Sequence, residues 1–137
     1  MEKLVEIYRE LHDTGVTMID RPLPFSAETK SAVLRLCDDK YGIFVDSSHL
    51  TMAEESVCIA HEAGHIATGS THAVCSPYDV VARHEYRANK WAIKKLIPKD
   101  ELDNAVRHGN TEVWELAEEF GVTEEFMIKA INYYKNA

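Results

Sequence analysis

The chain has 137 residues, of which 45% are hydrophobic and 28% charged, a composition typical of a soluble globular domain that can bury a core. Its formal net charge of −8 argues against non-specific nucleic-acid binding, which depends on cationic surface. No apolar run approaches the ~18 residues of a membrane span or the roughly 7–15 of a signal-peptide core, so we expect one cytoplasmic domain, residues 1–137, without membrane contact.

The first third of the chain predicts a helix followed by a small sheet. Apolar residues at helical spacing predict a helix over 2–13, which Gly15 ends. The segment VTMI (16–19) predicts a short strand. Residues 31–46 predict a hairpin, in which the strands AVLRL and GIFV flank a polar turn around residues 38–40. We therefore expect a small three-stranded antiparallel sheet.

The rest of the chain predicts helices. The segment TMAE (51–54) has the pattern of a capping box and predicts a helix from about 52 to 68, before Gly69. Ser76 as N-cap and Pro77 at the first helical position predict a second long helix, which Pro98 ends. Three shorter helices are expected at about 99–108, 111–120 and 124–135. The expected fold class is α+β with a majority of helices.

The helix over 52–68 contains the sequence HEAGH. His61 and His65 are one helical turn apart on one face, so both imidazoles can reach a single ion. HExxH on a helix is a metallopeptidase signature, in which the histidines bind zinc and the glutamate, here Glu62, polarises the metal-bound water. The motif also occurs in helices whose histidines merely face solvent or are satisfied in the core. A stripe of small residues would let another element approach this helix closely: Ala60, Gly64 and Ala67.

A third metal ligand is predicted on the following helix. Its apolar stripe, at positions 81, 88 and 92, continues through Glu85. A carboxylate on an inward stripe is costly unless it is paired or binds a metal. Two histidines and one glutamate would leave a fourth zinc position open for water. The alternative is that Glu85 pairs with a cation such as Lys90 or Arg107.

Other residues near the motif are weaker candidates. His72 competes as the third ligand because HEAGHIATGSTH approaches the metzincin pattern HExxHxxGxxH, but two threonines occupy its glycine and histidine positions. His72, His84 and Tyr86 could each stabilise an oxyanion, although no motif fixes any of them. Cys58 precedes His61 by one turn and is interpreted as a small buried filler. Since no CxxC pair is present, all three cysteines (Cys37, Cys58 and Cys75) are expected to be reduced, mostly buried thiols.

A family resemblance follows from two segments. HEAGH (61–65), followed about twenty residues later by HEYRANKWAIKKLIP (84–98), resembles the ImmA/IrrE family of zinc metallopeptidases. The resemblance covers nearly the whole chain. It departs at Trp91, where a phenylalanine is more usual, and this difference should affect packing only.

The resemblance implies both a site and a role. His61, His65 and Glu85 would bind Zn2+ on a zincin-like helix, and Glu62 would be the general base of a gluzincin-like endopeptidase. The family's reported role is cleavage of a DNA-binding repressor, often in phages and mobile elements. The resemblance therefore implies one regulatory protein, a repressor, as the substrate.

The C-terminal region, about 99–137, raises an alternative of another class. Its segment ELAEEFGVTEEFMIKAINYY (115–134) has the helix–turn–helix cadence of a DNA-binding regulator without catalysis. Residues 111–137 contain six acids against two lysines, so direct nucleic-acid binding is not expected. This region is interpreted as a structural helix pair or a docking surface. A metal-free descendant used only for binding is disfavoured by the intact HExxH and Glu85.

Overall fold

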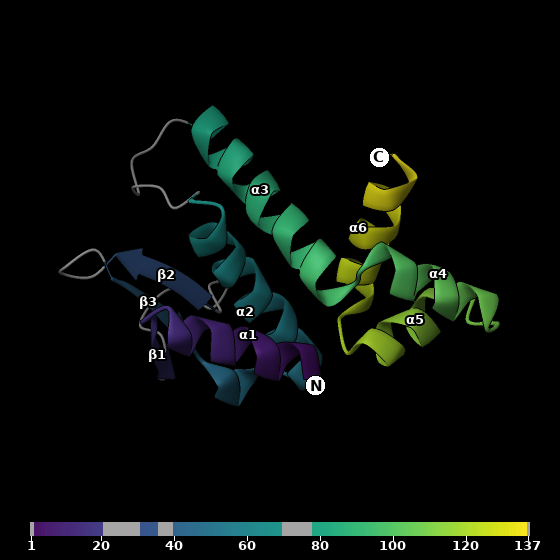
Figure 1. Ribbon diagram of the computed structural model, residues 1–137, viewed down its shortest axis with the longest axis horizontal. Coiled ribbons are helices and arrows are strands. Elements are labelled where there is room, and N and C mark those ends of the chain that lie inside the picture. The colour runs from purple at the N-terminus through teal and green to yellow at the C-terminus, as the bar shows by residue number, and fades with distance from the viewer. Residues whose placement is uncertain (1, 21–30, 36–39, 70–77, 137) are drawn as a thin grey trace.

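The computed structural model describes residues 2–20, 31–35, 40–69 and 78–136 (Figure 1). Its helices are α1 (Glu2–Asp13), α2 (Met52–Ala67), α3 (Tyr78–Leu96), α4 (Lys99–Arg107), α5 (Val113–Phe120) and α6 (Glu124–Lys135), with a 3-10 turn at Ser47–His49. Its strands are β1 (Thr17–Asp20), β2 (Ser31–Arg35) and β3 (Tyr41–Val45). The sheet, α1 and α2 lie at one end and α4–α6 at the other, with the long α3 running between them. The expected α+β class with a helical majority is confirmed.

The sheet is mixed rather than antiparallel. Its strand order is β1-β3-β2; β2 and β3 form the predicted antiparallel hairpin, but β1 pairs in parallel with β3, Thr17 opposite Gly42. The expectation of a fully antiparallel sheet is wrong because β3 enters between β1 and β2. The first and third strands run in one direction, so they pair in parallel once they are neighbours. Of the predicted turn at 38–40, residues 38 and 39 lie outside the described residues.

The local signals place most helix ends correctly. Thr51 Oγ1 accepts from the Glu54 amide at 3.1 Å and Glu54 Oε1 accepts from the Thr51 amide at 3.0 Å, so the capping box of α2 is confirmed. At α6 only the first of these two bonds is present: the Thr123 side chain accepts from the Phe126 amide at 3.2 Å. The predicted start of α3 at Ser76 and Pro77 lies outside the described residues.

The contact between α2 and α3 fixes the frame of the site. A Cβ on Gly64 would lie 2.5 Å from the backbone oxygen of Ala88, so only glycine permits this approach. Ala60 is fully buried, as the small-residue stripe predicts, whereas Ala67 is exposed at the end of the helix. α1 and strands β2 and β3 also contact α2. The core includes large side chains without exposed surface from several elements: Ile7, Ile43, Ile59, Leu96, Ile97 and Met127.

At the C-terminal end, α5 and α6 contact each other across a tight turn. Gly121 adopts a left-handed conformation (φ +66°), and Val122 is buried beneath the turn. The predicted helix–turn–helix cadence is therefore present. Trp114 on α5 is 57% exposed. Across the described residues, no helix combines the length and the apolar character that crossing a membrane requires.

Candidate metal centre

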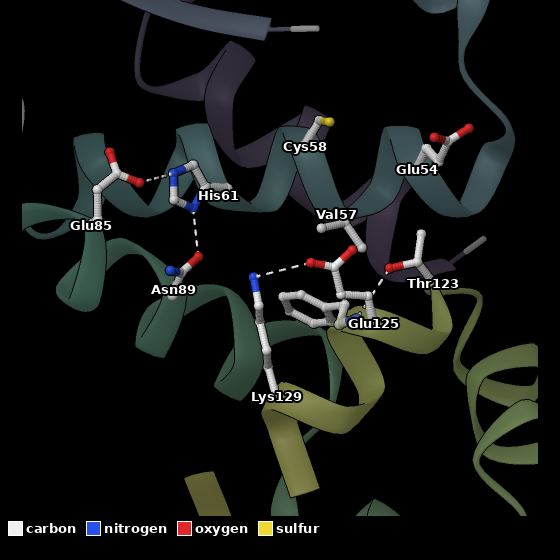
Figure 2. A pocket seen from close by; sticks show the side chains of 10 residues that line it. Glu54, Val57, Cys58, His61, Glu85, Asn89, Thr123, Glu125 and Lys129 are labelled. Atoms are coloured by element: carbon white, nitrogen blue, oxygen red, sulfur yellow. Dashed lines mark hydrogen bonds and ion pairs between the residues drawn. The ribbon is translucent and has the colours of Figure 1, made fainter. Parts of the chain in front are cut away.

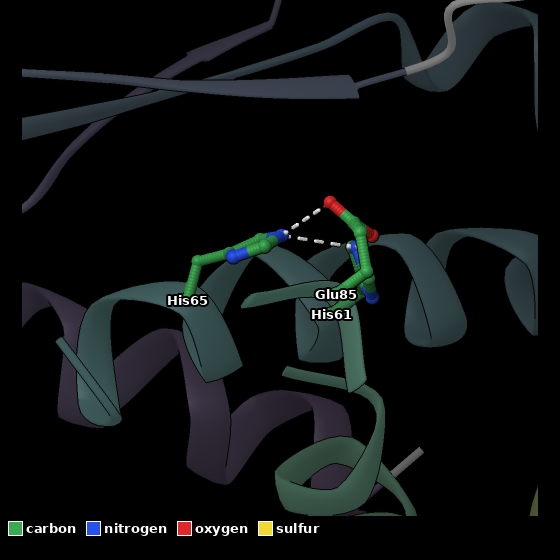
Figure 3. A group of neighbouring side chains, drawn as sticks. All are labelled: His61, His65 and Glu85. Atoms are coloured by element: carbon green, nitrogen blue, oxygen red, sulfur yellow. Dashed lines mark hydrogen bonds and ion pairs between the residues drawn. The ribbon is translucent and has the colours of Figure 1, made fainter. Parts of the chain in front are cut away.

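Two adjacent helices bring the predicted ligands together (Figure 3). His61 Nε2 lies 2.7 Å from Glu85 Oε2, and His65 Nε2 lies 3.1 Å from Glu85 Oε1. The two Nε2 atoms are 3.2 Å apart. In the described part of the chain, Glu85 therefore pairs with these histidines, and the alternative of pairing with Lys90 or Arg107 is wrong.

The cluster is buried at one end and open at the other. The side chain of His65 is 5% exposed, that of His61 is 22% exposed, and that of Glu85 is 42% exposed. Glu85 thus lies at the open end of the cluster. The apolar stripe had predicted a position inside the core. A ligand that reaches the cluster would approach from the side of Glu85 and His61.

Asn89 orients the His61 ring. The amide oxygen of Asn89, one turn after Glu85 on α3, lies 2.8 Å from Nδ1 of His61 (Figure 2). An amide oxygen can only accept, so Nδ1 carries the proton and Nε2 faces Glu85 and His65. Asn89 was not predicted as a site residue. Its spacing of four from Glu85, which puts both on one helical face, was the available signal.

The electrostatics of the cluster suit a bound cation. Burial alone would lower the pKa of His61, but the hydrogen bond and charge of Glu85, with the charge of Glu62 and the bond to Asn89, raise the pKa above its usual 6.5. Hydrogen bonds from His61 and His65 hold the pKa of Glu85 well below its usual range. The cluster thus attracts a proton when no metal is bound, and a divalent cation could take the place of that proton.

The donor atoms also fit zinc. All three lie within 4.8 Å of one another. Zinc bonds of ~2.0–2.2 Å place two ligands of one tetrahedral ion roughly 3.3–3.5 Å apart. The distances between the donor atoms are close to this separation, so small shifts would let them surround one ion. Two imidazoles and a carboxylate are a donor set typical of catalytic zinc, with a fourth position left open.

A cleft of about 360 Å³ opens beside the cluster (Figure 2). We call it the metal cleft. Its lining residues come from α2 (Glu54, Val57, Cys58 and His61), α3 (Glu85 and Asn89) and the start of α6 (Thr123, Glu125, Phe126 and Lys129). The part played by α6 was not predicted. Cys58 is only partly buried and lines this cleft, so its interpretation as a buried filler is wrong; Cys37 and Cys75 lie outside the described residues.

The other predicted site residues are placed less centrally. Glu62 is 7% exposed beside His61 and is not among the residues that line the metal cleft. His84 is partly buried on α3. Tyr86 is 60% exposed and lines a different cavity. His72 lies outside the described residues.

The comparison with protein families agrees with the geometry. The family model described as the IrrE N-terminal-like domain (Peptidase_M78) matches residues 13–132, which include the whole cluster, α4, α5 and most of α6. The chain belongs to the ImmA/IrrE metallopeptidase family. The resemblance inferred from HEAGH and the later helix is thus confirmed. Searches of the curated proteins and of the solved structures each found no significant match.

Proposed function

We propose that this chain is a zinc-dependent endopeptidase whose metal is held by His61, His65 and Glu85. The observation that carries the proposal is the convergence of three donor atoms, from two helices, at a cleft that solvent reaches. Membership of a metallopeptidase family supports the same reading. In this proposal residues 1–137 act as one peptidase domain.

Each residue then has a distinct role. A bound zinc would supply Lewis acidity to water and to the peptide carbonyl. Glu62 accepts a proton from the attacking water and returns it to the leaving amine. It is buried, follows His61 directly in the chain, and its charge raises the pKa of His61. Asn89 keeps Nε2 of His61 directed at the metal position.

The proposed substrate is one regulatory protein, a DNA-binding repressor of a phage or mobile element encoded near this chain. Family membership supports this choice. The cleft fits a polypeptide substrate, because its lining residues extend from the cluster along α2 to the start of α6. The alternative, a binding protein with a helix–turn–helix C-terminus, has support in the α5–α6 geometry but none in its charges.

The test is a Glu62→Gln variant co-expressed with the neighbouring repressor. We expect discrete repressor fragments with the parent chain and none with the variant, because an amide cannot accept the water's proton. Elemental analysis should find about one zinc per chain in both proteins, since Glu62 is not a ligand.

A Glu85→Gln variant is the matched control, because it makes the same chemical change at a proposed ligand. It should lose zinc as well as cleavage. Cleavage at the parent rate by Glu62→Gln would show that the catalytic assignment is wrong. Full zinc retention by Glu85→Gln would remove Glu85 from the ligand set.

A further inference from the structure

A second cavity continues from the metal cleft. It has a volume of about 590 Å³ and lies between α3 and α6. Asn89 and Lys129 line both cavities, so the two are contiguous at these residues. Asn89 is also the residue that contacts Nδ1 of His61, so the second cavity begins at a neighbour of a proposed metal ligand. We call this second cavity the amide groove.

The charge of the amide groove is opposite to that of the chain. The chain carries a formal net charge of −8, but the described residues that line the groove include Lys90 and Lys129 and no Asp or Glu. Lys129 Nζ is 3.8 Å from Glu125 Oε1, with both side chains more than half exposed. Such a surface pair contributes little, so the lysine stays available to another anion. The metal cleft has the other sign, since three glutamates line it and Lys129 is its one described lysine or arginine.

The polar lining also suits a peptide backbone. Asn132 of α6 and Asn136, the C-cap residue of that helix, line the groove together with Asn89. A carboxamide has both a donor and an acceptor, which is the pattern that an extended peptide presents along its backbone. Asn89 gives its oxygen to His61 and keeps its NH2 group to donate to a peptide carbonyl.

The length of the amide groove limits how many residues of an extended peptide it can hold. Lys129 of α6 and Asn136, its C-cap residue, are seven positions apart, or about 10 Å at ~1.5 Å per helical residue. An extended chain covers that distance with about three residues at ~3.3 Å each.

We propose that the amide groove binds an extended, acidic segment of the substrate, on one side of the scissile bond. Lys90 and Lys129 select aspartate or glutamate within about four residues of the cut, and the asparagines hold the backbone. The inference rests on the proposed peptidase function, and it adds a specificity site that the metal ligands do not supply.

The experiment uses the full chain loaded with zinc and a library of peptides from a digested bacterial proteome. Mass spectrometry of the products should show acidic residues enriched on one side of the cut. Lys90→Glu and Lys129→Glu should each lower kcat/KM for an acidic peptide from that set by roughly five- to tenfold, because like charges then meet. Lys135→Glu is the control, since it makes the same charge change on α6 but lines a different cavity.

Binding provides a second measurement that does not depend on turnover. The same peptide, labelled with fluorescein, should bind Glu62→Gln protein, and the added Lys90→Gln change should weaken its Kd severalfold. Cleavage without an acidic preference, or a preference unchanged in both Lys→Glu variants, would overturn the groove assignment and leave the peptidase function standing. Failure of the zinc-loaded parent to cut any peptide would instead contradict the peptidase function, and the groove assignment with it.

Discussion

One hydrogen bond at the centre of the site decides which nitrogen of His61 can bind a metal. The Asn89 oxygen lies 2.8 Å from Nδ1, so Nδ1 donates and Nε2 is directed at Glu85 and His65. A ring held in this way loses little further freedom when the ion binds, because its rotamer and tautomer are already set.

Removing that acceptor should weaken zinc binding. We expect Asn89→Ala to lower the zinc affinity by about 10- to 100-fold, the usual effect of losing a partner that orients a ligand. Asn89→Asp keeps an oxygen at this position and should restore most of the affinity. Competition with a chromophoric chelator measures both. Asn104→Ala, the same change at an exposed position on α4, should leave the affinity unchanged; equal affinities for Asn89→Ala and the parent would remove this role.

The residues of the cluster differ in how far the sequence could predict them. The spacing of His61 and His65 is a property of one helix, so their convergence could be predicted without knowing the fold. Glu85 could be predicted because a carboxylate interrupts an apolar stripe. Asn89 shares a helical face with Glu85, but its bond to His61 and the place of Cys58 at the metal cleft depend on how α3 and α6 lie against α2.

At the scale of elements too, features set by nearby residues could be predicted, and features set by packing between elements could not. The ends of α2 and α6 follow from caps within a few residues of each helix. The pairing of β1 with β3 does not, because the alternation along a strand reports which face is buried and not which strand lies beside it. The burial of Gly42 and Ile43 in β3, against the partly exposed β1, is what a central strand and an edge strand require.

The close approach of α2 and α3 makes Gly64 a structural requirement of the site. In Gly64→Ala the new methyl group would meet backbone atoms of Ala88, which no side-chain rotation can move away. Alanine should recover up to ~1 kcal/mol of helix propensity, but overpacking typically costs about 1–3 kcal/mol. We expect a net loss of stability in urea unfolding and a lower zinc affinity, since Glu85 moves away from the histidines.

Gly69→Ala separates these two effects. Gly69 has a φ of +63° and no atom within 4 Å of a new Cβ, so alanine there is strained but collides with nothing. This variant should lose stability while keeping the parent zinc affinity. If Gly64→Ala also keeps the parent affinity, the spacing of the two helices does not control the site.

At the scale of the whole molecule, α6 is the C-terminal helix that lines the candidate site. Its first turn lines the metal cleft and its later turns line the amide groove, while Phe126, Met127 and Ala130 are buried in the core. α6 thus forms one wall of both cavities, and the helix–turn–helix cadence places α5 against this helix. The six acids of residues 111–137 argue against DNA binding, which needs cations around the recognition helix.

The whole chain should show the cluster in the pH dependence of its stability. In the metal-free protein Glu85 has a lowered pKa, so its contribution is present above its unfolded value of about 4.5 and is lost as the pH falls. His61 has a raised pKa, so its contribution is complete below about 6.5 and is lost as the pH rises through the folded pKa. The pair therefore stabilises the metal-free fold most between about pH 4.5 and 6.5.

Zinc should offset the loss of stability of the metal-free protein at higher pH, because zinc competes with the proton on His61. We expect the increase in Tm caused by excess zinc, relative to EDTA, to grow from pH 5 to pH 8 as that competition ends. This increase in Tm can be measured by thermal unfolding followed by circular dichroism at four pH values. Glu85→Gln removes the charge that raises the His61 pKa, so in this variant zinc should shift Tm little and the shift should vary less with pH. A zinc shift of equal size at pH 5 and pH 8 in the parent chain would mean that the metal does not displace a proton from His61, and the ligand would have to be sought elsewhere.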